Sequence, residues 1–263
     1  MTTARDCVLG QAVGDALGVP YEFMRRGSFA CTDMVGHGTH DQPAGTWSDD
    51  TSMTLAILDS FRELGRIDVG DIRSRFCDWY ENDAYTCGRL FDIGNATAAA
   101  LRLGHGLAGE RDNGNGSLMR TVPLAFTPAT DDEVRAVSAI THAHPISTEA
   151  CVRMVHVARD LIAGARPCEV AAAYGVDAEK PRDEVPSSGF VLDTFDAALW
   201  CLANTSAYAD CVLAAVNLGD DTDTTAAVAG ALAGILYGEQ SIPAPWLNRL
   251  RAKPMILSCL STL

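Results

Sequence analysis

Apolar residues at three- and four-residue spacing recur along the chain of 263 residues, and no stretch reads convincingly as a run of strands. A chain patterned in this way buries many helices against one another, so we expect an all-α fold. At this length one large core is possible, and we expect a single compact multi-helix domain over residues 1–263. The expected helices cover 51–64, 68–80, 94–103, 131–140, 147–163, 167–174, 191–203, 207–217 and 223–237.

Three glycine-marked stretches without helical periodicity lie between these helices, at 25–47, 104–123 and 175–189. The third is polar, charged and proline-rich, which is typical of a surface loop, and it is too short to link two substantial domains. The first two combine glycine with Asn, Asp, His and Arg. This composition lets the backbone approach a ligand while polar groups face it. Pro245, in the segment 242–250, marks a further helix start.

The formal net charge of −14 argues against a general nucleic-acid or anionic-membrane surface, since either requires clustered Lys and Arg. Nine cysteines form no C-x-x-C pair, which favours reduced thiols over disulfides or a zinc site. No apolar leader develops before Asp15, and the small-residue stretch 226–238 is too short to span a bilayer. We therefore expect a cytoplasmic monomer that binds neither membranes nor nucleic acid in general.

Two expected helices begin with acidic residues flanked by hydroxyls, "SDDT" at 48–51 and "DDTDTT" at 220–225. Helix capping needs only one such residue at each start. If the two clusters meet, four or five carboxylates would share one place, and each would raise the pKa of the others. Carboxylate and hydroxyl oxygens are the ligands that Mg²⁺ prefers. The pair of clusters therefore predicts a site for one or two divalent cations.

Two other interpretations compete with a site for divalent cations. Each cluster could serve only as a helix cap, which is more plausible for one cluster than for both. An EF-hand loop is suggested by the D-x-D spacing of Asp221 and Asp223. However, its sixth and twelfth positions, counted from Asp221, hold Ala226 and Leu232 instead of Gly and Glu.

Six motifs cover the chain nearly end to end: "GQAVGDALGVPYEF" (10–23), "SDDTSMTLA" (48–56), "DIGN" (92–95), "GNGSLMR" (114–120), "THAHP" (141–145) and "NLGDDTDTTAAVAGALAGILYG" (217–238). Together they resemble the ADP-ribosylglycohydrolase family, whose order they follow, and they are most similar to its bacterial dinitrogenase-reductase-activating branch. The resemblance implies an all-α fold with a binuclear metal centre, Mg²⁺ or Mn²⁺, in a cleft that binds ADP-ribose.

The resemblance also assigns roles to individual positions. The implied metal ligands are Ser48, Asp49, Asp50, Asp221, Asp223 and Thr224. The implied catalytic residues are Asp92, which faces the target side chain, Glu22, which follows an apolar helix, and Asp50. The implied substrate-binding residues are Asn95, Glu110, Gly114, Asn115, Gly116, His142 and Phe190.

Three positions depart from the family pattern. Asp220 stands where a second glycine is common, and it either binds a metal or points away and caps the helix. Ser48 replaces the commoner Thr. Phe190 replaces a frequent Tyr, which keeps a ring for stacking on adenine but loses the hydroxyl.

Other polar residues of the motifs have structural interpretations. We expect Asp15 to hydrogen-bond backbone near the site, and His144 to bond the turn before Pro145. Arg120 is positioned to reach a phosphate or to pair with a core carboxylate, and we interpret it as structural.

The expected activity is the metal-dependent removal of ADP-ribose from a protein side chain, with the N-glycosidic bond to arginine as the first candidate. A carboxylate such as Asp92 would pair with the guanidinium and assist proton transfer. Alternative substrates are O-linked, small-molecule or nucleic-acid conjugates of ADP-ribose. A non-catalytic ADP-ribose-binding relative and a two-metal phosphohydrolase that releases AMP or phosphate are the other classes considered.

Overall fold

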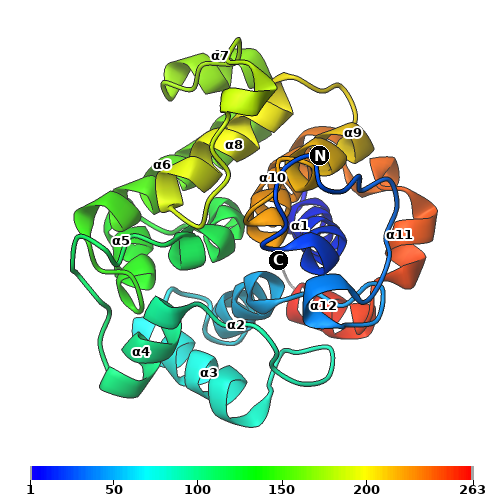
Figure 1. Ribbon diagram of the computed structural model, residues 1–263. Coiled ribbons are helices and arrows are strands. Elements are labelled where there is room, and N and C mark those ends of the chain that lie inside the picture. The colour runs from blue at the N-terminus through cyan, green and yellow to red at the C-terminus, as the bar shows by residue number, and fades with distance from the viewer. Residues whose placement is uncertain (1, 262–263) are drawn as a thin grey trace.

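Two helices, α1 (Ala4–Gly18) and α10 (Thr222–Tyr237), pack against each other at the centre of the fold. In the computed structural model, which describes residues 2–261, both are buried along nearly their whole length, and the other helices surround them (Figure 1). Their apolar residues cover all sides, as expected of interior helices. The Thr222 hydroxyl donates a hydrogen bond to the Gly18 carbonyl over 2.8 Å, so the end of α1 meets the start of α10.

Glycines allow the two helix backbones to touch. A Cβ atom at Gly14 would lie 2.0 Å from the carbonyl oxygen of Ala226, and one at Gly10 would lie 2.3 Å from that of Gly230. Any larger residue would therefore push the helices apart. Because α1 leads toward Glu22 and α10 begins beside Asp221, this contact also sets the spacing between acidic residues from the two ends of the chain.

Substituting Gly14→Ala is expected to lower the free energy of unfolding by about 1–3 kcal/mol, because the added methyl overpacks a backbone contact. Thermal or denaturant unfolding measures the loss. Gly70→Ala is the matched control, since Gly70 is an exposed residue of α3 (Val69–Asn82) whose Cβ would approach only an Asp68 carboxylate oxygen, at 3.4 Å. It should be neutral or stabilising by up to about 1 kcal/mol. Equal stability of the two variants would contradict the packing argument.

The remaining elements complete an all-helical domain, and residues 2–261 contain isolated β-bridges but no strand. Helix α3 packs on α2, α5 on α6, and α8 and α9 on α10. The further α-helices are α2 (Asp49–Leu64), α4 (Asn95–Leu103), α5 (Asp131–Ala139), α6 (Pro145–Ile162), α7 (Pro167–Ala173), α8 (Val191–Ala203), α9 (Tyr208–Val216), α11 (Ala244–Arg249) and α12 (Lys253–Cys259). Short 3₁₀ helices cover Val19–Tyr21, Gly38–His40, Asn115–Arg120, Val122–Phe126, Arg182–Glu184 and Glu239–Ser241.

The expected all-α fold is confirmed, and each of the nine expected helices has ends within about two residues of those observed. The apolar helix before Glu22 and the helix start at Pro245 are also confirmed, as α1 and α11. The expectation that the three glycine-marked stretches lack helix is wrong for four 3₁₀ segments: Gly38–His40 in 25–47, Asn115–Arg120 and the start of Val122–Phe126 in 104–123, and Arg182–Glu184 in 175–189. A 3₁₀ helix turns every three residues, so these segments show no α-helical periodicity. All nine cysteines are free.

No helix within residues 2–261 combines the length and the apolar character needed to cross a lipid bilayer.

Candidate active site

Helix α2 begins at the first acidic cluster, and its start is capped by Ser48 and Asp15, not by the side chains of Asp49 and Asp50. The Ser48 side chain accepts a hydrogen bond from the backbone N–H of Asp50, at 3.3 Å. The Asp15 carboxylate, from α1, accepts from the backbone N–H groups of Ser48, at 2.8 Å, and Thr51, at 3.1 Å. Ser48 and Asp15 thus satisfy the helix start, as predicted for Asp15. Capping alone therefore does not account for the Asp49 and Asp50 side chains.

The second cluster begins α10 and meets the first one. The Thr224 hydroxyl donates to Asp50 Oδ2 over 3.3 Å, although the two residues are 174 positions apart. Asp221 is at the N-cap position, yet its side chain caps nothing, and its Oδ2 instead accepts from the Asn115 amide at 2.8 Å. The expectation that the two acidic helix starts lie together is confirmed by these contacts.

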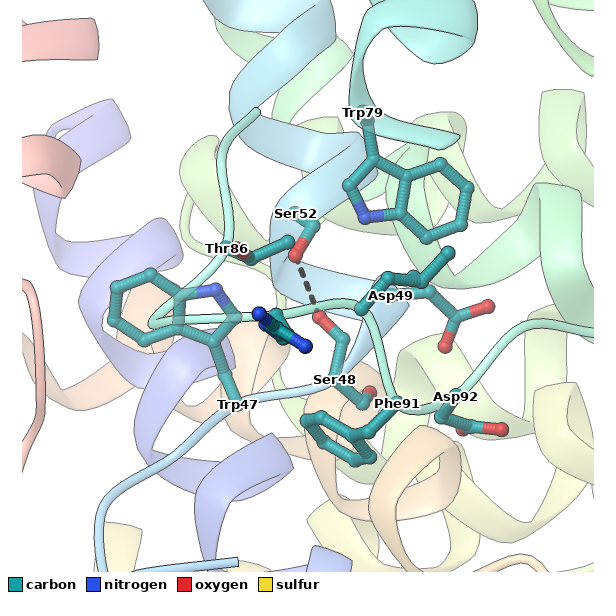
Figure 2. A pocket seen from close by; sticks show the side chains of 10 residues that line it. Trp47, Ser48, Asp49, Ser52, Trp79, Thr86, Phe91 and Asp92 are labelled. Atoms are coloured by element: carbon teal, nitrogen blue, oxygen red, sulfur yellow. Dashed lines mark hydrogen bonds between the residues drawn. The ribbon is translucent and has the colours of Figure 1, made fainter. Parts of the chain in front are cut away.

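Three further side chains extend the acidic group. Carboxylate oxygens of Glu22, Asp221 and Asp223 lie within 4.8 Å of one another, and ligand atoms of Glu22, His40 and Asp92 form a second such set. Glu22 belongs to both sets, and its carboxylate is hydrogen-bonded to His40 Nε2. Figure 2 shows the carboxylates of Asp49 and Asp92 directed to the same side, beyond the indole of Trp47 and the hydrogen bond from Ser52 to Ser48.

A cavity of about 410 Å³ opens on this acidic group, which is within the usual range for a small-molecule site. Of the residues that the resemblance assigned to the site, ten line it: Glu22, Asp49, Asp92, Asn95, Gly114, Asn115, Gly116, His142, Asp221 and Thr224. Three others, Ser48, Asp50 and Asp223, are buried beside these residues. Phe190 pairs with Gly114 by a backbone bridge and is part-exposed at 38%, while Glu110 is exposed, and neither lines the cavity.

Burial and mutual repulsion make the carboxylates of the site hard to ionise. Burial, with the charges of Asp92 and Asp15, raises the pKa of Asp49 well above its ordinary value. The same causes, with Asp15 and Asp49 as neighbours, act on the pKa of Asp50. Burial raises the pKa of Glu22 to about 7, against the opposing effect of its bond with His40. A bound cation would remove this repulsion.

The donor set fits a divalent metal. Three buried carboxylate oxygens, Asp50 Oδ1, Asp221 Oδ1 and Asp223 Oδ2, have no hydrogen-bond partner in the part of the chain that the structure describes. A buried, unpaired carboxylate oxygen is costly, whereas Mg²⁺ and Mn²⁺ are hard cations that bind such oxygens. The clustered carboxylates, with the Thr224 hydroxyl, are therefore compatible with a metal site.

The glycine loop, Gly114 to Gly116, and His142 also line the cavity. A Cβ atom at Gly116 would lie 2.9 Å from His142 Cε1 and 3.1 Å from the Thr97 hydroxyl, so only glycine fits between these two side chains. The backbone N–H of Asn115 donates to the Gly189 carbonyl over 3.0 Å, which holds the loop against the segment before α8. Bare backbone thus faces the cavity here, as predicted from the glycine content.

The unexplained carboxylate of the sequence, Asp220, is exposed and does not line the cavity. Its φ of +59° lies in the left-handed region, which accounts for the glycine common at this position in the family. Phe23, at φ +64°, donates its backbone N–H to the Asp220 carbonyl over 2.7 Å. A backbone hydrogen bond therefore links the two left-handed residues, and the Asp220 side chain takes no part in the cavity.

Sequence reasoning missed several residues of the cavity. Phe23, Thr97 and Arg111 line it, and His40 is hydrogen-bonded to the Glu22 carboxylate. None of these four residues is part of a sequence spacing that indicates a particular chemistry. Histidines of a glycine-rich stretch were the available signal for His40. His144 accepts from the Ile146 backbone N–H at 3.3 Å and so caps α6, as predicted.

The helical fold and the joined acidic clusters are those of a known hydrolase class. The sequence profile described as ADP-ribosylglycohydrolase matches residues 2–261, and the chain belongs to this family. It is 37% identical over 273 residues to a protein of Serratia proteamaculans named ADP-ribosylarginine hydrolase Tri1, an alignment covering 94% of this chain and 75% of the relative.

Two further comparisons agree. The chain is 35% identical over 267 residues to the ADP-ribosyl-dinitrogen reductase glycohydrolase of Rhodospirillum rubrum, over 93% of this chain and 89% of that protein. A solved structure described as an ADP-ribosylglycohydrolase-related protein complex matches with a TM-score of 0.83 at 31% identity, over 98% of this chain and 95% of that one. The family predicted from the motifs is confirmed.

Proposed function

We propose that this protein hydrolyses the bond between ADP-ribose and an arginine side chain of a modified protein, with two divalent cations as cofactors. The observation that carries the proposal is the position of Asp92. Its side chain lines the cavity and clusters with Glu22, which also clusters with the carboxylates of Asp221 and Asp223. The names of the relatives from Serratia proteamaculans and Rhodospirillum rubrum support it.

Asp92 is suited to a cationic target. A guanidinium presents a planar set of N–H donors, and a carboxylate accepts two of them side by side. An O-linked serine has no comparable donor set, so it gains less from this carboxylate. Burial raises the pKa of Asp92 above its ordinary value, and the charge of His40 acts against this shift. A carboxyl group placed here could assist proton transfer during the reaction.

Hydrolysis breaks the bond between the ribose anomeric carbon and the arginine nitrogen. Water supplies a hydroxyl to the carbon, and its proton ends on the leaving guanidine, which departs as guanidinium. In this scheme Asp92 pairs with the guanidinium and guides the proton, and Glu22, held by His40, is the second carboxylate within reach. Divalent cations, when bound, would orient and polarise the ribose hydroxyls.

The rest of the cavity would take the nucleotide. Gly114, Asn115 and Gly116 present backbone that a diphosphate can approach closely, and Asn95 lies beside Asp92 on the ribose side. Phe190, at the rim next to Gly114, is available to stack on adenine. The cations would be held by the six residues predicted as ligands: Ser48, Asp49, Asp50, Asp221, Asp223 and Thr224.

The proposal is tested by incubating the protein with peptides that carry ADP-ribose on arginine or on serine, and with a phosphoester-linked conjugate. Each reaction is run with Mg²⁺, with Mn²⁺ and with a chelator, and the product is identified by mass spectrometry. We expect free ADP-ribose from the arginine conjugate, only when metal is present. Release from the other conjugates but not from arginine would contradict the arginine linkage.

The same experiment separates the remaining classes. A phosphohydrolase would yield AMP or phosphate in place of ADP-ribose. Binding of ADP-ribose and metal without release from any conjugate would identify a non-catalytic binding protein.

A further inference from the structure

A buried arginine without a carboxylate partner lies behind the cavity. The Arg120 side chain is fully buried, and the structure pairs it with no acidic residue among positions 2–261. Its guanidinium carbon lies 4.6 Å above the Phe76 ring. One nitrogen, Nη1, donates to the Gly116 carbonyl at 2.8 Å, and the other, Nη2, donates to Thr141 Oγ1 at 2.9 Å. The structural role predicted for Arg120 is confirmed by these contacts.

The bond from Arg120 determines what the Thr141 hydroxyl can do. A guanidinium has donors only, so Thr141 Oγ1 must accept from it. The same oxygen lies 2.8 Å from His142 Nδ1, and it has no other hydrogen-bond acceptor within reach among the described residues. If Nδ1 carried the proton, the Thr141 hydroxyl hydrogen would be buried without an acceptor, at a cost of about 1–3 kcal/mol. The hydroxyl therefore donates to Nδ1.

His142 then carries its proton on the other ring nitrogen. Burial, together with the nearby charge of Arg120, lowers the pKa of His142 to about 3, so the ring is neutral at neutral pH. A neutral imidazole that accepts at Nδ1 has its hydrogen at Nε2. The Nε2 atom makes no hydrogen bond within the described part of the chain, and a Cβ atom at Gly114 would lie 3.4 Å from it.

We propose that Arg120 and Thr141 are positioning residues that hold His142 as the Nε2–H tautomer, so that it donates a hydrogen bond to the bound ligand at the glycine loop. The acceptor is an oxygen or ring nitrogen of a nucleoside diphosphate. The single guanidinium also orients the Gly116 carbonyl, so it aligns the loop and the donor together. This inference rests on the proposed function for the identity of the ligand.

The tautomer is measurable in the wild-type protein without any ligand. Long-range ¹H–¹⁵N NMR spectra of protein labelled on histidine distinguish a ring protonated at Nε2 from one protonated at Nδ1. The signal is assigned by its loss in His142→Gln. We expect Nε2–H at neutral pH, with no change on titration down to about pH 5. A ring protonated at Nδ1, or at both nitrogens, would overturn the proposal.

A matched pair of variants tests the functional consequence. Thr141→Val keeps the shape but lacks the hydroxyl, whereas Thr141→Ser keeps the hydroxyl. We expect Thr141→Val to shift the His142 signal toward the Nδ1 form and to weaken ADP-ribose binding, measured by calorimetry, by about fivefold to tenfold. Thr141→Ser should bind within about twofold of the wild type. Unchanged affinity of a folded Thr141→Val protein would contradict the role.

These results are separable from a failure of the proposed function. A wild-type protein that releases no ADP-ribose from any conjugate refutes the hydrolase proposal, while the tautomer is still read directly from the spectra. Thermal unfolding of both variants shows whether a change in affinity merely reflects lost stability.

Discussion

Replacing Asp92 with asparagine is expected to lower kcat/KM for ADP-ribosylated arginine by about 10²–10⁴-fold. The substitution keeps the size of the side chain but removes the charge that would pair with the guanidinium and the carboxylate that would pass the water's proton to the leaving guanidine. Release of ADP-ribose from a modified arginine peptide measures the effect. Binding of Mn²⁺, measured by calorimetry, should be retained, because the carboxylates of the two helix starts are unchanged.

Asp220→Asn is the control for this prediction. It makes the same chemical change next to the acidic cluster, at an exposed position, and asparagine tolerates the left-handed backbone. Its activity should stay within about twofold of the wild type. Wild-type turnover in Asp92→Asn, or equal losses in both variants, would refute the role given to Asp92.

Metal removal is expected to make stability fall as pH rises. Folding raises the pKa of Glu22 and Asp15 to about 7, and burial raises those of Asp49, Asp50 and Asp223 further above their ordinary values. The folded protein therefore binds more protons than the unfolded chain above about pH 4. For each extra proton bound by the folded protein, the free energy of unfolding falls by about 1.4 kcal/mol for every unit that the pH rises, until the pH reaches the raised pKa of that group.

One group acts in the opposite direction, since the lowered pKa of His142 adds stability as pH rises to about 6.5. The several carboxyls outweigh this single histidine. Unfolding curves of chelator-treated protein between pH 5.5 and pH 8 measure the balance. Mg²⁺ or Mn²⁺ should raise the unfolding temperature more at pH 8 than at pH 5.5, because bound metal needs ionised ligands.

Asp223→Asn supplies the comparison for the metal prediction. It should be more stable than the wild type at pH 8 without metal, because one buried charge is gone, and it should respond less to added metal. A chelated wild-type protein whose stability rises between pH 5.5 and pH 8 would contradict the assigned pKa directions.

Local sequence signals predicted the parts of the fold that depend on near neighbours. Helix α8 has the expected bounds because its apolar periodicity is clear and Gly189 precedes it. The pairing of the two acidic starts, which is a contact across 174 positions, followed from charge reasoning and family resemblance together. Helix α12 was not predicted, since Ala252 at its start offers no side-chain cap, whereas the equally short α7 begins at Pro167 with the capping residue Glu169.

Contacts between 3₁₀ or irregular segments that lie apart in the sequence were beyond sequence reasoning. Nothing in the sequence links His40 to Glu22, because a 3₁₀ turn after an irregular stretch brings them together. The bonds of Arg120 to Gly116 and Thr141 likewise depend on how the 3₁₀ segment packs against the end of α5. The side chain of Asp220 was left open, because its orientation follows from a left-handed backbone that no pattern indicates.

The backbone contact between α1 and α10 has a consequence for how this enzyme family can diversify. The carboxylates of α10 are fixed to the interior of the protein by close glycine contacts, whereas Asp92 lies in an irregular segment between α3 and α4. Under the proposed function, changes in that segment would alter which conjugate is accepted while the carboxylates of α10 stay in place. If the proposal holds, new linkage preferences would arise through this irregular segment, while the central helix pair keeps its acidic residues in place.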